Sequence, residues 1–159
     1  MVTRIVFFFL ILTSTAFSQI DFKNYFQEKT LRMDYYHSGN SDFEFYSFDE
    51  LKEEPYWGGS KTNLVDTFNY GNYYVKLKDK ASGDVIYSRG YSSLFREWQS
   101  TDEAKEISRT FVESVIMPYP KDTSVIEIYS RNNNNAFDKK FEVEVDPESP
   151  YISKEMELP

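Results

Sequence analysis

Three stretches of this chain alternate apolar and polar residues with a period of two. The side chains that share one face are Leu31, Met33 and Tyr35 in the first stretch, Tyr73, Val75 and Leu77 in the second, and Phe141, Val143 and Val145 in the third. Successive side chains of a strand point to opposite sides, so this period is typical of a strand that is buried on one face. The pattern predicts three strands whose apolar faces meet in one core.

Further strands are expected where β-branched and aromatic residues cluster between turn residues. They cover residues 43–48, 85–91, 95–99, 110–117 and 125–131. The strands at 73–78 and 85–91 should form a hairpin around residues 80–84, and the last two strands a second hairpin around the four asparagines at 132–135. The segment 37–41 is expected to be a turn, and Pro118 and Pro120 should stop the preceding strand at a sheet edge.

Four segments are not predicted to be strands. Residues 49–54 are acidic and fit one helical turn, and residues 55–70 read as a long ordered loop. Ser100 and Glu103 have the spacing of a capping box, which predicts a short helix from Thr101 to about Ser108. Residues 147–159 lack a core pattern and fit a linker or frayed tail. The fold class that follows is all-β, an antiparallel β-sandwich of about seven to eight strands with one short helix.

The first eighteen residues have the form of a signal peptide. Arg4 precedes an unbroken apolar run from Ile5 to Leu12, and Ala16 and Ser18 are small residues at the −3 and −1 positions of a cleavage site before Gln19. The run is shorter than the roughly 20 apolar residues that a membrane span needs. We therefore expect an exported protein, periplasmic or extracellular, with its folded domain at 19–146.

Charge and cysteine content narrow the classes of partner. The formal net charge is −8, which disfavours nucleic acid and anionic membrane surfaces as partners. The chain contains no cysteine, so packing alone must hold the exported domain together. Its thirteen tyrosines and two tryptophans supply large apolar areas for that purpose.

The inventory of reactive side chains excludes most catalytic sites. His37 is the only histidine, whereas a zinc motif of the H-E-x-x-H type needs two and a cysteine nucleophile needs a thiol. A serine triad would have to use His37, which we expect instead to be structural. The acidic clusters at 50–54 and 102–106 resemble solvated faces more than a pair of catalytic carboxylates. We predict no catalytic residue, no metal site and no cofactor; an enzyme using carboxylates alone is a weak third alternative.

Two sets of side chains are candidates for binding. Asn63, Asp66 and Asn69 offer oxygen ligands for calcium within one loop, but without a recognised spacing. The aromatic set Trp57, Tyr91, Phe95 and Trp98 would form either an exposed platform for a sugar or protein partner, or part of the core.

Several motifs in one order resemble a known family. They are Thr30–Gly39, Trp57–Asp66, Phe68–Gly71, Tyr73–Lys76, Ile86–Tyr91, Glu97–Ala104 and Pro118–Lys121. Together they resemble the N-terminal domain of the IgA-peptidase family of secreted zinc metallopeptidases, best known from Bacteroidota, over roughly residues 22–147.

The resemblance implies an accessory role. In that family the N-terminal β-sandwich precedes a catalytic domain that carries H-E-x-x-H and the zinc, and no position of this chain matches those residues. The expected function is therefore a non-catalytic domain that docks on a metallopeptidase catalytic domain or presents protein substrate to it. The alternative is a stand-alone secreted binding module for glycan or host protein.

Overall fold

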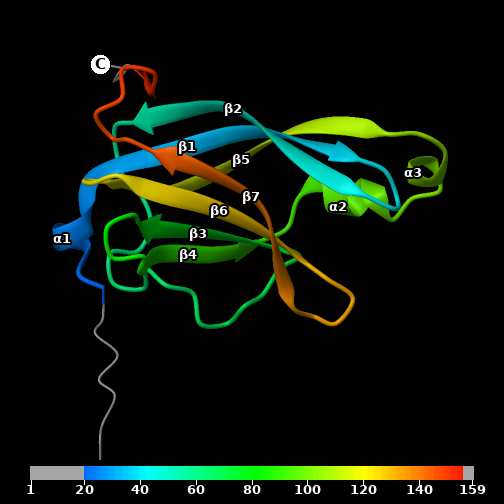
Figure 1. Cartoon of the computed structure of the whole chain (residues 1–159), viewed down its shortest axis with the longest axis horizontal. Coiled ribbons are helices and arrows are strands. Elements are labelled where there is room, and N and C mark those ends of the chain that lie inside the picture. Colours follow the sequence, from blue (N-terminus) through cyan, green and yellow to red (C-terminus); the bar gives the residue numbers. More distant parts are fainter. Residues whose placement is uncertain (1–19, 156–159) are drawn as a thin grey trace, which may run out of the picture.

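Two four-stranded sheets make up most of residues 20–155, the part of the chain that the computed structural model describes (Figure 1). The strands are β1 (Phe26–Gly39), β2 (Glu44–Glu54), β3 (Tyr73–Asp79), β4 (Val85–Tyr91), β5 (Arg109–Pro120), β6 (Ser124–Arg131), β7 (Phe137–Val145) and β8 (Ser153–Lys154). The expected all-β sandwich is confirmed. The predicted signal peptide lies outside the described residues.

The strand order is β5-β1-β2-β8 in one sheet and β4-β3-β6-β7 in the other. All neighbours are antiparallel except β2 and β8. Three short helices accompany the strands: α1 (Phe22–Tyr25), α2 (Leu94–Gln99) and α3 (Glu103–Glu106). No helix within residues 20–155 is long and apolar enough to cross a membrane.

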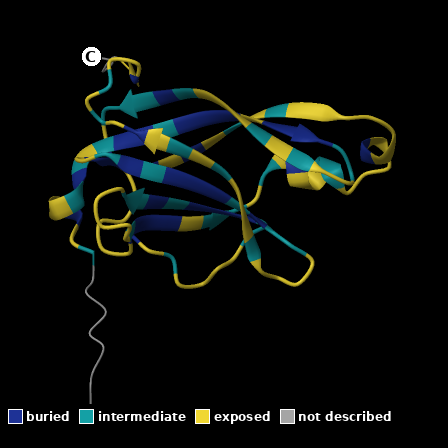
Figure 2. Cartoon of the chain, viewed as in Figure 1, coloured by how far each residue is buried: buried dark blue, intermediate teal, exposed yellow. Residues whose placement is uncertain are grey.

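The core lies between the two sheets, where the predicted alternation places it (Figure 2). The inward side chains of β1 and β3 are buried: Leu31, Met33, Tyr35, Tyr73, Val75 and Leu77. On β7, Val145 is buried, whereas Phe141 and Val143 pack against the core only in part. Phe141 and Val143 stay partly exposed because β7 is the outer strand of its sheet.

The prediction of a helical turn at residues 49–54 was wrong, because β2 continues as a strand to Glu54. The long strand β1 gives this segment a continuous partner, with Met33 opposite Leu51. Leu51 is buried, while Glu53 and Glu54 form ion pairs with Lys29 and Arg32. Pairing between strands therefore overrides the local helical tendency of an acidic segment.

The segments that follow β4 also differ from expectation. Residues 94–99 form the helix α2 and not a strand, and this helix places Phe95 and Trp98 side by side with a centroid distance of 5.7 Å. The predicted helix at 101–108 is reduced to the single turn α3, whose N-cap Asp102 makes no side-chain capping bond. The hydroxyl of Ser100 instead donates to the carbonyl of Glu97, so the capping box does not form.

The first turn begins later than predicted. Strand β1 includes His37 and ends at Gly39, and the amide of Asn40 then donates to the carbonyl of Phe43 at 3.0 Å. A side chain at Gly39 would place its Cβ 2.1 Å from that carbonyl oxygen. The glycine therefore sets where the hairpin turns, and His37 becomes a residue of the strand.

The end of β5 and the C-terminal segment both differ from the sequence-based expectation. The prediction that Pro118 stops the strand before it was wrong, because β5 continues through Pro118 to Pro120. Its place at the sheet edge was predicted correctly, and an edge strand tolerates the missing amide donors. Residues 147–155 of the segment expected to be a linker or frayed end instead fold back on the sheet: Ile152 is buried in the core, and β8 pairs with β2.

Candidate functional site: an aromatic groove along strand β4

The loop that joins β2 to β3, expected to be long and ordered, covers the free edge of β4. The carbonyl of Leu64 accepts a hydrogen bond from the amide of Ser88 at 2.9 Å, and the hydroxyl of Ser88 accepts one from the amide of Asp66 at 3.0 Å. At Gly90 the carbonyl of Tyr70 lies so close that an added Cβ would be 1.8 Å from it. An edge strand that would otherwise offer unpaired backbone groups is thereby protected.

The loop also holds its own shape. Both carboxylate oxygens of Asp66 accept backbone amides, from Phe68 at 2.9 Å and from Asn69 at 3.3 Å. Asn69 has a φ of 56°, which asparagine tolerates. From outside the loop, Arg131 donates from Nε to the carbonyl of Gly71 at 2.9 Å. The loop is therefore organised before any ligand arrives, which lowers the entropic cost of binding.

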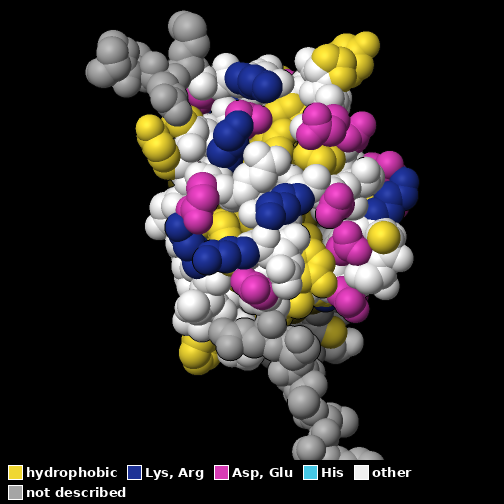
Figure 3. Space-filling view, turned by 90° about the vertical axis from the view of Figure 1, so that its left-hand side faces the viewer, with side chains coloured by type: hydrophobic (Ala, Val, Ile, Leu, Met, Phe, Trp, Pro, Cys, Tyr) yellow, Lys and Arg dark blue, Asp and Glu magenta, His cyan; other side chains and the backbone are white. Residues whose placement is uncertain are grey.

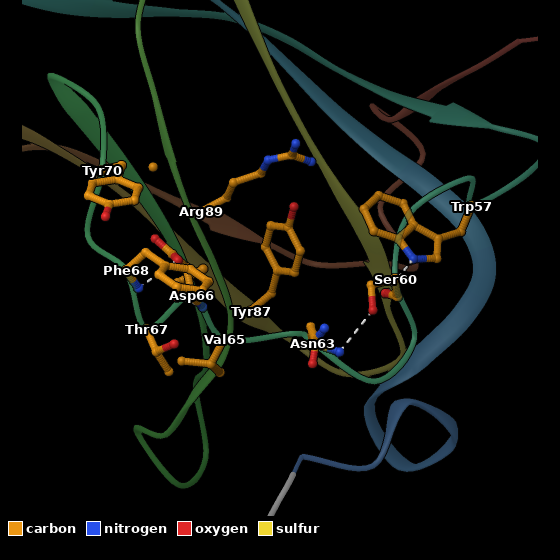
Figure 4. A pocket seen from close by; sticks show the side chains of 12 residues that line it. Trp57, Ser60, Asn63, Val65, Asp66, Thr67, Phe68, Tyr70, Tyr87 and Arg89 are labelled. Atoms are coloured by element: carbon orange, nitrogen blue, oxygen red, sulfur yellow. Dashed lines mark hydrogen bonds between the residues drawn. The ribbon is translucent and has the colours of Figure 1, made fainter.

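A groove of about 680 Å³ opens between this loop and β4 (Figure 4). This volume lies in the range of about 300–1,000 Å³ that is typical of ligand sites. Its aromatic lining comes from Trp57, Phe68, Tyr70 and Tyr87, and its polar lining includes Ser60, Asn63, Asp66 and Arg89. The groove combines apolar surface with a few hydrogen-bonding groups.

The two ends of the groove differ in exposure. Phe68 and Tyr70 are 73% and 76% exposed, with nearly parallel rings whose centroids are 5.9 Å apart. Trp57 is buried and packs edge-on against Tyr87, while its indole N–H donates to the carbonyl of Ser60 at 3.1 Å. The rings of Phe68 and Tyr70 are thus free for contact with a partner, whereas Trp57 forms a buried part of the groove wall.

Arg89 supplies the positive charge of the groove. Its side chain extends between Tyr70 and Trp57, with the Tyr87 hydroxyl pointing toward it (Figure 4). Burial raises the pKa of Tyr87, and the neighbouring guanidinium of Arg89 offsets part of that rise. Arg89 has no ion-pair partner among residues 20–155, so the donors that it does not use toward the Tyr87 hydroxyl are available to carbonyl or carboxylate oxygens of a ligand.

The four aromatic residues that the sequence singled out do not form one exposed patch. Trp57 lies in the groove, whereas Phe95 is fully buried and packs against Trp98 and Phe111. Tyr91 is partly buried, and its hydroxyl lies 3.0 Å from that of Tyr35. Phe95 is therefore a core residue, and an exposed platform made of all four side chains is not what the structure contains.

The sequence did not point to Phe68, Tyr70, Tyr87 or Arg89 as members of a site. The signal that was available is the high content of aromatic residues in a loop that also contains turn-forming residues. The same turn chemistry accounts for Asp66 and Asn69, two of the candidate calcium ligands, because both oxygens of the Asp66 carboxylate accept backbone amides. Within residues 20–155, no three His, Cys, Asp or Glu side chains gather as metal ligands.

The single histidine is sealed in the core with two carboxylates. His37 is fully buried, and its ring lies between those of Phe95 and Tyr46 at centroid distances of 3.8 and 4.2 Å. Nδ1 lies 3.0 Å from Oε2 of Glu113, and Nε2 lies 3.2 Å from Oε2 of Glu44. A carboxylate on each nitrogen favours the doubly protonated ring, which can donate to both, and leaves neither ring nitrogen facing solvent.

The charges of this cluster stabilise one another. Burial lowers the pKa of His37, but hydrogen bonds to Glu113 and Glu44 outweigh this and hold the pKa above its ordinary value. Burial likewise raises the pKa of each carboxyl group, and the hydrogen bond to His37 brings it below the ordinary value. The hydroxyl of Tyr35 also donates to Glu113 at 3.0 Å.

The outer face of the β5-β1-β2 sheet is a second apolar surface. Tyr36 of β1 lies opposite Val112 of β5, and both are exposed together with Phe45 and Ile116. The end of the molecule shown in Figure 3 differs from this face, since basic and acidic side chains alternate there and hydrophobic side chains are scattered between them.

The described residues thus form a β-sandwich with a titratable cluster sealed inside and an aromatic groove on its surface. Residues 21–142 match the family model described as Peptidase M64 N-terminus. The chain belongs to this family, which confirms the resemblance to the N-terminal domain of IgA peptidases. The match concerns the N-terminal region of a peptidase family, and no catalytic domain is detected. No curated protein matches the chain.

Proposed function

We propose that the chain is a non-catalytic accessory domain that binds protein substrate in the β4 groove and presents it to a peptidase catalytic domain. The observation that carries the proposal is the match to the N-terminal region of the M64 peptidase family. The groove gives the proposal its physical basis, because exposed rings of Phe68 and Tyr70 suit apolar side chains and Arg89 suits main-chain carbonyls.

The non-catalytic part of the proposal draws on the surroundings of His37. Both ring nitrogens are engaged by carboxylates, and the side chain is fully buried. A general base must reach the proton that it removes from a substrate, so His37 is unsuited to that role. Export, which the first eighteen residues predict, would bring the domain to the compartment of a secreted peptidase.

The test supplies the whole chain to an isolated catalytic domain of an M64 peptidase and follows hydrolysis of a protein substrate and of a short peptide. We expect the chain to lower the KM for the protein and to leave the short peptide unaffected. The double substitution Phe68→Ala and Tyr70→Ala should remove this effect. Tyr151→Ala is the matched control, because Tyr151 is 89% exposed and lies outside the groove.

Two results would contradict the proposal. If the groove variant stimulates as well as the unaltered chain, the groove does not present substrate. If the chain alone cleaves substrate and a substitution in it abolishes cleavage, the domain is an enzyme. Docking on the catalytic domain is a separate step, for which the apolar face at Tyr36 and Val112 is the candidate; Val112→Asp should weaken association without altering the groove.

A stand-alone module for glycan binding is the second candidate function. The observation that favours it is the exposed, nearly parallel pair Phe68 and Tyr70 beside the polar side chains of Asn63 and Asp66. Sugar rings present apolar C–H faces to aromatic rings and hydroxyl groups to such polar neighbours. Retention of the chain on a neutral-sugar array, lost in the same double variant, would favour this function over substrate presentation.

A further inference from the structure

A second pocket, of about 450 Å³, is lined by residues of three segments. Figure 1 draws all three on the right-hand side of the molecule. These segments are the turn between β1 and β2, the helix α2, and the hairpin of β6 and β7. The lining residues that matter for its chemistry are Asp42, Phe43, Glu44, Arg96, Asn133 and Lys140, with Arg131 beside them. None of these residues lines the β4 groove.

Three cations converge on this pocket although the chain has 26 acidic and 18 basic residues. Arg131 is held by backbone carbonyls, including those of Gly71 and Asn135. Arg96 donates to the side chain of Gln99 at 2.8 Å, and Lys140 has no hydrogen-bond or ion-pair partner among the described residues. None of the three cations forms a direct ion pair with a carboxylate, although Lys140 is close enough to Glu44 to help lower the pKa of that carboxyl group, so the pocket has donors for an anion.

The floor of the pocket is a carboxylate that the core holds in place. The side chain of Glu44 is 11% exposed, and its Oε2 faces His37 at 3.2 Å and the Tyr73 hydroxyl at 3.4 Å. Both contacts use the same oxygen. A hydrogen bond from the side chain of Ser130 also reaches this carboxylate, so a hydroxyl donor of a ligand would join these partners, with Asp42 as a further acceptor at the rim.

This mixture of groups selects among anions. Two carboxylates in the pocket disfavour a multiply charged anion such as phosphate, because like charges repel at short range. A ligand with one carboxylate and several hydroxyl groups would satisfy both the cations and the acceptors. The ring of Phe43, which is 49% exposed, adds an apolar face at the rim.

We propose that this pocket binds a sugar acid. Its carboxylate is held by Arg96 and Lys140, its hydroxyl groups donate to Glu44 and Asp42, and one face of the sugar ring packs on Phe43. This pocket shares no lining residue with the β4 groove, so the sugar-acid proposal is tested independently of the proposed substrate presentation.

The experiment titrates the whole chain with glucuronate, with N-acetylneuraminate and with neutral glucose at low ionic strength, and follows backbone NMR shifts. We expect both sugar acids to shift the resonances of the pocket and glucose to leave them unchanged. Arg96→Gln and Lys140→Gln should each weaken binding about tenfold or more, which corresponds to loss of one charge-assisted hydrogen bond. Tyr70→Ala in the groove should have no effect.

Lys139→Gln is the matched control for Lys140→Gln. Lys139 is the adjacent residue of β7, but it pairs with Glu127 and Glu142 and does not line the pocket. Three results would overturn the proposal: no shift with either sugar acid, equal shifts with acetate and phosphate, or equal losses in the two lysine variants. The second result would mark the pocket as a site for adventitious ions only, and the third would mean general electrostatic attraction. Unchanged spectra away from the pocket verify that each variant is folded.

Discussion

Replacement of the buried histidine tests the account of the core most directly. In the variant His37→Gln, the carboxylates of Glu44 and Glu113 keep their burial but lose the cation between them. Their side chains are only 11% and 9% exposed, so water cannot compensate. Removing one partner of a buried ion pair typically costs about 3–5 kcal/mol. Since domains of this kind have about 5–15 kcal/mol of stability, the variant should fold but be strongly destabilised.

The pH dependence gives this prediction a second signature. The pKa values of Glu44 and Glu113 lie below the ordinary 4.5, so their contribution is present above about pH 4.5 and is lost as the pH falls through the folded-state values. The pKa of His37 lies above the ordinary 6.5, so its contribution is fully present below that pH and is lost as the pH rises through the folded-state value. Stability should therefore be greatest between about pH 4.5 and 6.5.

Urea unfolding from pH 4 to 9, followed by tryptophan fluorescence, measures both effects. The unaltered chain should lose stability toward high pH, and His37→Gln should remove that loss. Adding Glu113→Gln to the variant should restore part of the stability, because one buried charge is then gone. A cost below about 1 kcal/mol for His37→Gln, or an unchanged high-pH decline in the variant, would refute the argument that His37 is a buried cation.

Three further predictions concern packing. Leu77→Ala in the centre of β3 should cost about 2–5 kcal/mol in unfolding experiments, and a loss below about 1 kcal/mol would mean that this face of the strand is not core. Gly90→Ala should loosen the loop over β4, because its Cβ would collide with the carbonyl of Tyr70; faster hydrogen exchange at residues 64–71 checks this, and unchanged protection would speak against it. Ile152→Ala should cost about 2–5 kcal/mol if the C-terminal segment is docked as described, and a neutral result would show that it is not.

Local patterns in the sequence were sufficient to predict the strands that are buried on one face. Leu31, Met33 and Tyr35 alternate with polar residues, and the same residues are buried in the structure. The same reasoning failed at residues 49–54, where pairing with β1 makes the segment a strand. It also failed at residues 94–99, which form a helix whose Phe95 packs on His37 and Phe111. Neither partner can be read from a short window of sequence.

The amino-acid sequence determined the fold class, the single buried face of the main strands, the hairpins and the family. These properties depend on local periodicity, turn residues and motifs in a fixed order. Only the tertiary structure decided that Phe95 belongs to the core, that the loop at 55–72 closes the edge of β4 and opens a groove there, and that His37 meets Glu44 and Glu113. The reason is that each of these arrangements joins residues far apart in the chain, and exposure and charge pairing are properties of that assembly.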